Sequence, residues 1–224
     1  KEFDEDDKDF AFDEFVITGT PAQPDWIFWE EDFDSLLVYE VTNGSMGNNG
    51  SDDFFHVTSS MPSQQGQSIG GAEGQFLAGR DINQWYGNGD NIQVVWDSIS
   101  VTGLSNLVFS VDVAALGSYF EDDDILLFEY RVDGGSWTNL MMFNGTSTSS
   151  NSQPLARNLT FSGAATGTQV TNTFNTFMQG ISGTGNMVDI RLTVEFFKFT
   201  AENFAIDNIA LAGDLASNTI VYSN

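Results

Sequence analysis

The segment ILLFEYRVDGGSWTNLMMF (residues 125–143) decides the fold, because it contains two strand patterns on either side of a tight turn. Residues 125–132 and 136–143 are each rich in apolar and aromatic side chains, as in strands that pack one face against a core. Between them lies Asp133-Gly134-Gly135, whose glycines can adopt the positive φ that a tight hairpin turn requires. The segment therefore predicts a β-hairpin.

Strand patterns recur along the rest of the chain between clusters of Gly, Asn, Asp and Ser, whereas helical periodicity is nearly absent. The clearest of them lie at residues 92–101, 106–113, 187–197 and 204–211. One segment, 170–179, fits a helix or a strand equally well. Low-complexity stretches that we expect to be loops lie at residues 43–53, 59–74 and 144–153. We predict an all-β protein, a two-sheet antiparallel β-sandwich and in particular a jelly-roll.

The composition is that of a folded domain with a large core. Hydrophobic residues make up 41% of the 224 residues, and Phe alone occurs 20 times. The chain has no Cys, which excludes disulfides and thiolate metal sites. No apolar run approaches the roughly 20 residues that a membrane helix needs. We expect an extracellular or cell-surface location without membrane insertion.

The charge balance constrains the partners. With 32 acidic residues against 7 Lys and Arg, the formal net charge is -25. Such a field repels phosphate backbones, so nucleic acid is not expected as a partner. The same self-repulsion destabilises a compact state unless salt or bound cations reduce it, which makes calcium a hypothesis.

The two ends of the chain match each other. Residues 10–19 (FAFDEFVITG) align without gaps with residues 204–213 (FAIDNIALAG), and at the same offset residues 218–224 fall on residues 24–30. This match predicts a jelly-roll repeat at 20–213, an acidic arm at 1–19 that carries a closing strand of a preceding repeat, and a linker with a first strand of a following repeat at 214–224. An end strand placed at the edge of a neighbouring sheet would satisfy its backbone groups. The side chains buried by this assembly would be Phe10, Phe12, Phe15, Ile17, Ile220 and Tyr222.

Three stretches carry a resemblance to a known kind of domain: DDILLFEYRVDGGSWTNL (123–140), GISGTGNMVDIRLTVEF (180–196) and ENFAIDNIALAG (202–213). They resemble a jelly-roll-like domain that recurs in large secreted or surface proteins of marine and environmental bacteria. The last stretch is also similar to the closing strand of MAM-type and carbohydrate-binding jelly rolls. Together with the match of the ends, the resemblance implies a non-enzymatic structural or adhesive repeat of an extracellular filament or surface protein, whose partners are copies of itself or neighbouring repeats.

The resemblance also implies a structural calcium ion. In such sandwiches an acidic pair on the first strand and the Asp of the closing strand often share one ion, and here Glu30, Glu31 and Asp32 would supply the first part and Asp207 the second. Calcium takes roughly six to eight oxygen ligands, which carboxylates and backbone carbonyls can supply. The acidic runs at 4–7 and 121–124 are interpreted as solvated charged faces in preference to cation sites.

Catalysis is not predicted. The only histidine is His56, which has no nucleophile-elbow motif near it, and we expect it at the surface or at a strand edge. Acidic residues are so abundant that no particular pair stands out as a glycosidase pair. No phosphate-binding motif is present in the sequence.

The alternative function is that of a carbohydrate-binding module in a secreted multidomain enzyme, with polysaccharide as its partner. Sugar rings stack on exposed aromatic side chains, and the best platform in the sequence is Trp85 with Tyr86, followed by Trp137 beside the hairpin turn. The remaining tryptophans, Trp26, Trp29 and Trp96, lie in strand patterns and are expected in the core.

Four Asn-X-Ser/Thr sequons are candidate N-glycosylation sites in surroundings that favour exposure. They are Asn43, Asn49, Asn144 and Asn158.

Overall fold

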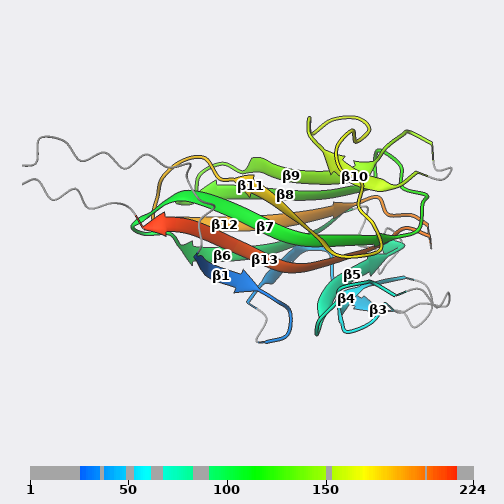
Figure 1. Ribbon diagram of the computed structural model, residues 1–224, viewed down its shortest axis with the longest axis horizontal. Coiled ribbons are helices and arrows are strands. Elements are labelled where there is room, and N and C mark those ends of the chain that lie inside the picture. The colour runs from blue at the N-terminus through cyan, green and yellow to red at the C-terminus, as the bar shows by residue number, and fades with distance from the viewer. Residues whose placement is uncertain are drawn as a thin grey trace, which may run out of the picture.

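The computed structural model describes residues 26–35, 38–48, 53–61, 68–82, 91–149, 153–199 and 201–215. These residues form thirteen strands, all but β2 labelled in Figure 1, and no α-helix. The strands are β1 (Ile27–Glu31), β2 (Glu40–Asn43), β3 (Gly47–Asn48), β4 (Phe54–Thr58), β5 (Phe76–Arg80), β6 (Asn91–Ser100), β7 (Leu104–Leu116), β8 (Ile125–Val132), β9 (Thr138–Gly145), β10 (Leu155–Asn158), β11 (Asn175–Gly180), β12 (Met187–Glu195) and β13 (Asn203–Leu215).

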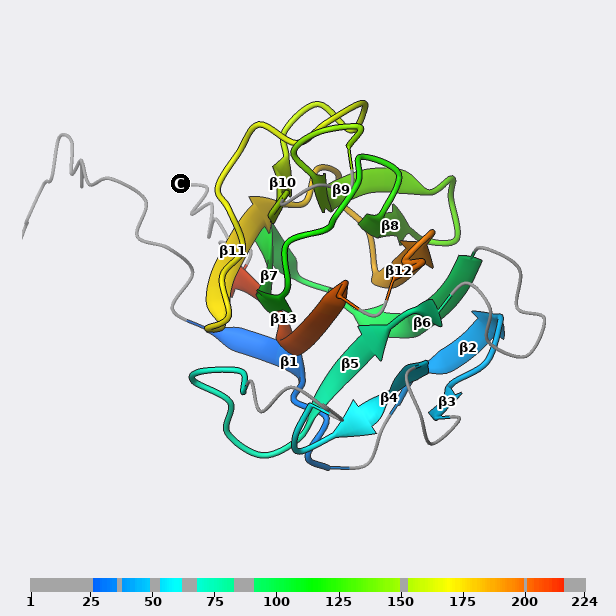
Figure 2. The ribbon, with the colours of Figure 1, turned by 90° about the vertical axis from the view of Figure 1, so that its right-hand side faces the viewer.

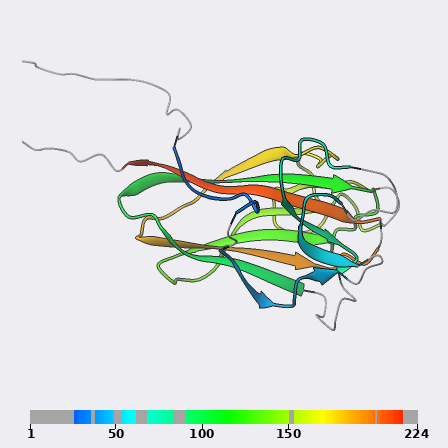
Figure 3. The same cartoon turned by 90° about the horizontal axis from the view of Figure 1, so that it is seen from below.

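The strands form two sheets that face each other, as the views in Figures 2 and 3 show. The seven-stranded sheet has the order β11-β7-β13-β5-β4-β3, and β1 also pairs with β13. The six-stranded sheet has the order β10-β9-β8-β12-β6-β2, and all pairs of named strands are antiparallel. The predicted all-β, two-sheet antiparallel sandwich of jelly-roll type is therefore confirmed.

Strand β13 is central to the seven-stranded sheet. It pairs with β7 on one side, while on the other side β5 pairs with residues 203–206 and β1 pairs with residues 209–212. The closing strand expected from the sequence thus lies between strands of its own chain on both sides. None of the described residues form a helix long and apolar enough to cross a membrane.

The core lies between the two sheets and is rich in phenylalanine. On β7 the side chains alternate between buried and partly exposed, so that one face of the strand packs inward. The rings of Phe109 on β7 and Phe128 on β8 lie 5.2 Å apart, and those of Phe197 and Phe204 lie 4.8 Å apart. Each fully buried side chain of this size contributes about 1.5–3 kcal/mol of transfer free energy. Many of the phenylalanines in the sequence are thus buried in this core.

The outer face of the seven-stranded sheet is covered in part by a second, smaller cluster of buried residues. Phe76 on β5 packs edge-on against Phe174, which precedes β11, with 5.7 Å between ring centroids. Met61 and Ile69 from the connection between β4 and β5 are buried in the same cluster. Strand β5 is therefore buried along its whole length.

Several sequence expectations can be compared directly with these elements. The hairpin at Asp133-Gly134 joins β8 to β9, and both residues have a positive φ, 48° and 72°. The ambiguous segment 170–179 contains β11 rather than a helix, because Asn175–Gly180 pair with β7. Part of the predicted loop 43–53 forms the short strand β3. Trp26, expected in the core, is 52% exposed, so that expectation was wrong.

Candidate functional site

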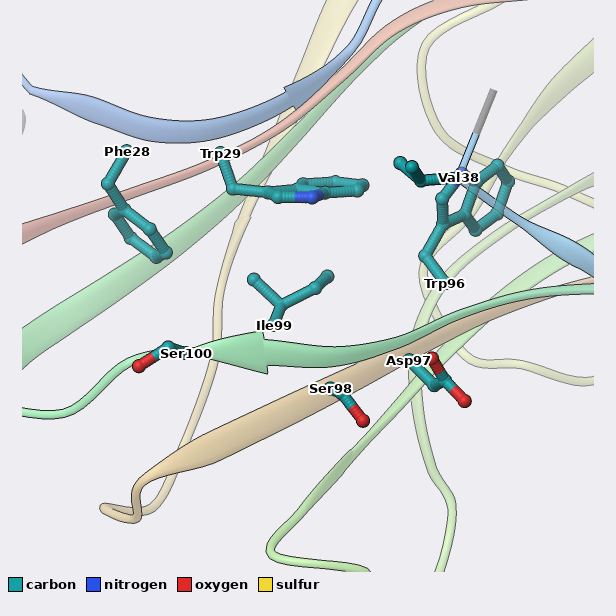
Figure 4. Close-up of a pocket in the computed structure, with 8 residues that line it drawn as sticks. All are labelled: Phe28, Trp29, Val38, Trp96, Asp97, Ser98, Ile99 and Ser100. Atoms are coloured by element: carbon teal, nitrogen blue, oxygen red, sulfur yellow. The ribbon is translucent and has the colours of Figure 1, made fainter. Parts of the chain in front are cut away.

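An open groove lies at one side of the sandwich, where β1 of the seven-stranded sheet faces β6 of the six-stranded sheet (Figure 4). Its volume is about 370 Å³, within the range of about 300–1,000 Å³ that is common for small-ligand sites. We call it the β1–β6 groove, and it is lined by Phe28, Trp29, Val38, Trp96, Asp97, Ser98, Ile99 and Ser100.

The groove exists because the edge of β6 is left uncovered there. Strand β2 pairs with residues 93–95 of β6 only, so that residues 96–100 have β12 as their partner on one side and the groove on the other. On the opposite wall, β1 covers the part of β13 beyond β5. The two sheet edges therefore meet here across an opening that no described strand closes.

A β-bulge in β6 directs the side chains of the lower wall. Between Trp96 and Ile99 the strand contains one residue more than the facing segment of β12, and Ser98 has a φ of 58°. As a result Trp96 and Ile99 are both buried toward the groove, whereas Asp97 and Ser98 are both exposed. A bulge re-aims side chains in this way because the extra residue interrupts the alternation of the strand.

A second irregularity lies on the upper wall, in β1. The pairing of β1 with β13 shifts by one residue between Ile27 and Trp29. Consecutive residues of a regular strand point to opposite faces, yet Phe28 and Trp29 both line the groove (Figure 4). The shift explains how two adjacent aromatic side chains reach the same opening.

The ring of Trp96 is held by a buried carboxylate. Its Nε1 donates a hydrogen bond to Glu31 Oε2 at 3.3 Å, and Glu31 also accepts hydrogen bonds from the backbone N–H groups of Phe33 (3.0 Å) and Val38 (3.5 Å). Tyr39 packs edge-on against Trp96 with 6.1 Å between centroids. Burial raises the pKa of Tyr39, and the nearby charge of Glu31 raises it further. The hydrogen bond to Glu31 and the contact with Tyr39 therefore hold the indole of Trp96 in one position at the groove.

Asp189 connects the groove to the outer face of the six-stranded sheet. Its Oδ1 accepts a hydrogen bond from Ser98 N in the bulge at 2.7 Å, and its Oδ2 accepts one from Arg131 Nε at 2.6 Å. The guanidinium groups of Arg131 and Arg191 lie 4.6 and 4.3 Å from the ring centroid of Trp137. Through Asp189, this cluster holds the backbone of Ser98 in the bulge.

The predicted glycan-binding residues have different outcomes. Trp137 is described, and because two guanidinium groups already lie over its ring, it offers less stacking surface than its place beside the turn suggested. Trp85 and Tyr86 lie outside the described residues. Trp96 is 1% exposed in the core, as expected, whereas Trp29, also expected in the core, is half-buried and lines the groove. The run Ile27-Phe28-Trp29, which breaks strand alternation, was the signal that could have revealed it.

The residues of the implied calcium site are only partly brought together. Glu30 is exposed, whereas the neighbouring Glu31 is buried and bonded to Trp96, so the two do not form a pair. Asp207 is 3% exposed, and burial raises its pKa to about 7, with further contributions from the charges of Asp112, Asp34 and Asp32. The charge of Asp32 thus acts on Asp207 together with those of Asp34 and Asp112, two residues that were not expected at this site, and the calcium ion there stays a prediction.

Two of the four sequons are buried, which corrects the expectation that they are exposed. Asn144 and Asn158 are 0% and 2% exposed. The side-chain amide of Asn144 donates to the carbonyls of Asp122 and Gly163, and that of Asn158 donates to Gly163 and to Asn144 Oδ1. A glycan has no space at either amide in the folded chain. Asn43 is exposed, and Asn49 lies outside the described residues.

The remaining predicted residues fall in two groups. His56 lies on β4, half-buried, with its ring 5.7 Å from that of Phe54. The assembly residues at 10–17 and 220–222 lie outside the described residues, so the proposed end strands stay a prediction.

Comparison with solved structures finds proteins of similar fold. A carbohydrate-binding module, CBM61, in complex with beta-1,4-galactotriose has 9% sequence identity and a TM-score of 0.44, covering 82% of this chain and 94% of that chain. The K1 cleaved adhesin domain of Lys-gingipain from Porphyromonas gingivalis W83 has 12% identity and a TM-score of 0.45, covering 83% and 98%. A cyclase from Fischerella sp. TAU has 12% identity and a TM-score of 0.44, covering 88% and 94%.

These likenesses concern the fold and assign no residue of this chain to a function. No family model matches the sequence, and neither does any curated protein.

Proposed function

We propose that this chain is a non-catalytic extracellular module that binds carbohydrate in the β1–β6 groove. The observation that carries the proposal is the pairing of half-buried aromatic side chains (Phe28 and Trp29) with exposed polar ones (Asp97 and Ser98) around one opening. The C–H faces of sugar rings pack on aromatic rings, and sugar hydroxyls exchange hydrogen bonds with carboxylate and hydroxyl groups. The groove offers both kinds of contact.

The surroundings of the groove fit a ligand that is larger than the groove itself. Trp26, just before β1, and Ile27, its first residue, are each 52% exposed, and Val38, which precedes β2, is 57% exposed. Apolar side chains of this size that are exposed close together mark a surface that contacts something. A glycan chain that continues beyond the groove would cover them.

The charge of the protein indicates the class of glycan. The formal net charge is -25, and the groove itself contains Asp97. Uronic acids and sulfated sugars would meet repulsion at this site. We therefore expect neutral sugars or amino sugars.

The groove does not support hydrolysis of the bound glycan. Glycosidases generally need two carboxyl groups that flank the scissile bond. Among the described residues that line the groove, Asp97 is the single carboxylate. Binding without cleavage is the activity that this arrangement fits.

The test is a binding screen of the full chain against neutral, amino-sugar and acidic polysaccharides, followed by calorimetry on the best ligand. Trp29→Ala should weaken binding by about 30-fold or more, because removal of a central aromatic anchor typically costs more than about 2 kcal/mol. Tyr119→Ala is the matched control, since Tyr119 is 45% exposed in the connection between β7 and β8, away from the groove residues.

Trp85→Ala separates the groove from the platform predicted on the sequence. If Trp85→Ala abolishes binding while Trp29→Ala leaves it intact, the glycan binds at Trp85 and the groove assignment is wrong. If no polysaccharide of the three classes binds, the carbohydrate-binding function itself is rejected.

The structural or adhesive repeat remains the second candidate function. In the described chain the place of the closing strand is filled by β13 and the place beside it by β1, both from the same chain. An arm such as residues 10–19 would therefore have to displace a strand or use another edge to join a neighbour. Light scattering of the full chain and of a chain without residues 1–19 tests this role, since end-strand assembly predicts oligomers that only the full chain forms.

A further inference from the structure

The acidic run that precedes β8 folds against the residue that precedes β13. Glu121 and Asp124 lie in the connection between β7 and β8, and Glu202 lies between β12 and β13. One carboxylate oxygen from each of the three lies within 4.8 Å of the others. Oxygens that share one calcium ion sit about 2.3–2.6 Å from it, so they can be at most about 5 Å apart. The spacing is therefore that of a shared cation.

Two of these carboxylates are buried and each has one oxygen without a hydrogen bond. Asp124 and Glu202 are both 0% exposed. Among the described residues, no hydrogen-bond partner reaches Asp124 Oδ1 or Glu202 Oε1. Buried polar atoms almost always have a partner, so two such oxygens in one cluster indicate a ligand.

The other oxygens of the same carboxylates are fixed by the backbone. Asp124 Oδ2 accepts a hydrogen bond from Glu121 N at 2.6 Å. Glu202 Oε2 accepts hydrogen bonds from Lys198 N at 2.7 Å and Phe199 N at 2.9 Å. Each side chain is thus held in place by one oxygen while the second stays available.

The two connections that carry the cluster are packed closely together. Gly117 has a φ of 102°, and a Cβ at this position would overlap the carbonyl oxygen of Ala201. A Cβ on Gly145 would overlap the carbonyl oxygens of Phe120 and Glu121. Only glycine allows these close backbone approaches, so the two connections around the cluster are packed directly against their neighbours.

The electrostatics oppose three free carboxylates at this place. Burial raises the pKa of Asp124 to about 9, and the charge of Glu202 raises it further. Burial raises the pKa of Glu202 to about 7, against the hydrogen bonds from the backbone, and Glu121 and Asp81 add to the increase. Lys198 pairs with the half-exposed Asp123 at 3.2 Å, outside the buried pair. A bound cation would offset the mutual repulsion of these neighbouring carboxylates.

We propose that Glu121, Asp124 and Glu202 bind a calcium ion that joins the β7–β8 connection to the start of β13. The ligands are all oxygen, which suits a hard divalent cation. Calcium is favoured over magnesium because the two buried carboxylates leave little room for the waters that magnesium retains. This site differs from the one that the resemblance implies at Asp207, which lies at the bulge of β13.

The test measures calcium binding and thermal stability of the full chain after treatment with a chelator, at pH 7.5. Calcium should raise the Tm by about 5 °C or more at a hundredfold excess over Kd, and magnesium should raise it less. Asp124→Asn and Glu202→Gln keep the shape of the side chain and remove its charge. Each should lose one bound calcium per chain and the Tm increase. Asp123→Asn, in the same run but outside the buried pair, should behave as the unaltered chain does.

Several results would overturn the proposal. One is an unaltered chain whose Tm and calcium content do not respond to calcium, and another is an Asp124→Asn chain that keeps both responses. If Asp207→Asn loses the response while Asp124→Asn keeps it, the ion binds at the implied site instead. An equal response to magnesium would reject calcium as the specific ion. Because Asn and Gln keep an oxygen that can accept the same backbone N–H groups, both variants are expected to fold, and circular dichroism checks this.

Discussion

The indole N–H of Trp96 on β6 donates a hydrogen bond to the buried carboxylate of Glu31 on β1, at 3.3 Å, and so links one sheet to the other beside the groove. The same carboxylate receives the N–H groups of Phe33 and Val38, which turn the chain away from β1. A single buried charge therefore fixes both the position of a groove wall and the direction of the following segment.

Glu31→Ala should lower the free energy of unfolding by about 3 kcal/mol, because it leaves the buried N–H groups of Trp96 and Phe33 without an acceptor. Urea unfolding followed by tryptophan fluorescence measures this loss. Glu30→Ala, one residue earlier and exposed, is the control and should change stability by less than about 0.5 kcal/mol. Equal effects of the two substitutions would contradict the role given to Glu31.

Gly79→Ala should destabilise the sandwich by about 2–3 kcal/mol. A Cβ at Gly79 would overlap the ring of Phe204, which is 0% exposed and packed against Phe197 and Phe55, so the ring cannot move aside. Gly180→Ala is the matched control, since a Cβ there meets no atom within 4 Å and its stability should stay the same or rise slightly. Thermal unfolding measures the stability of both variants. A Gly79→Ala variant as stable as the unaltered chain would show that the ring of Phe204 can move away from the added Cβ.

His56 should titrate below the ordinary histidine range, because burial lowers its pKa in the folded state. The folded-state pKa lies below the unfolded one, so the contribution of His56 to stability is complete above the unfolded pKa of about 6.5 and decreases as the pH falls through it. The chain has one histidine, so a single proton resonance reports its titration by NMR. A midpoint at or above 6.5 would contradict the burial of this ring.

Asn144→Ala should cost about 2 kcal/mol, because the carbonyls of Asp122 and Gly163 then lose a shared buried donor. Chemical denaturation measures the change, with Asn43→Ala as the control at an exposed sequon. When the chain is produced in a glycosylating host, mass spectrometry should find Asn144 and Asn158 unmodified in the folded protein. A glycan at either position in folded material would refute their burial.

Much of the sandwich follows from local sequence pattern. The hairpin between β8 and β9 was predictable because an Asp-Gly pair lies between two strand patterns, and the turn places its positive φ values at Asp133 and Gly134. Strand β6 was predictable because its apolar residues alternate, as in a half-buried strand, and β13 because its apolar residues form a nearly continuous run, as in a strand buried on both faces. Segment 170–179 was ambiguous because the pairing with β7, and not its own pattern, makes it a strand.

The sequence by itself determined that the chain is all-β, where most strands lie, and that its charge disfavours anionic partners. Only the tertiary structure decided the sites. The groove depends on two bulges, in β1 and β6, whose positions arise from pairing with β13 and β12, and the run Ile27-Phe28-Trp29 is a local sign of the first one alone. The cation cluster depends on Glu202 meeting the run at 121–124, and Asn144 and Asn158 are buried by contacts with the segment that follows β10. Apolar alternation is a local property of a strand, whereas the meeting of distant side chains depends on how the sheets pack, which short sequence patterns do not encode.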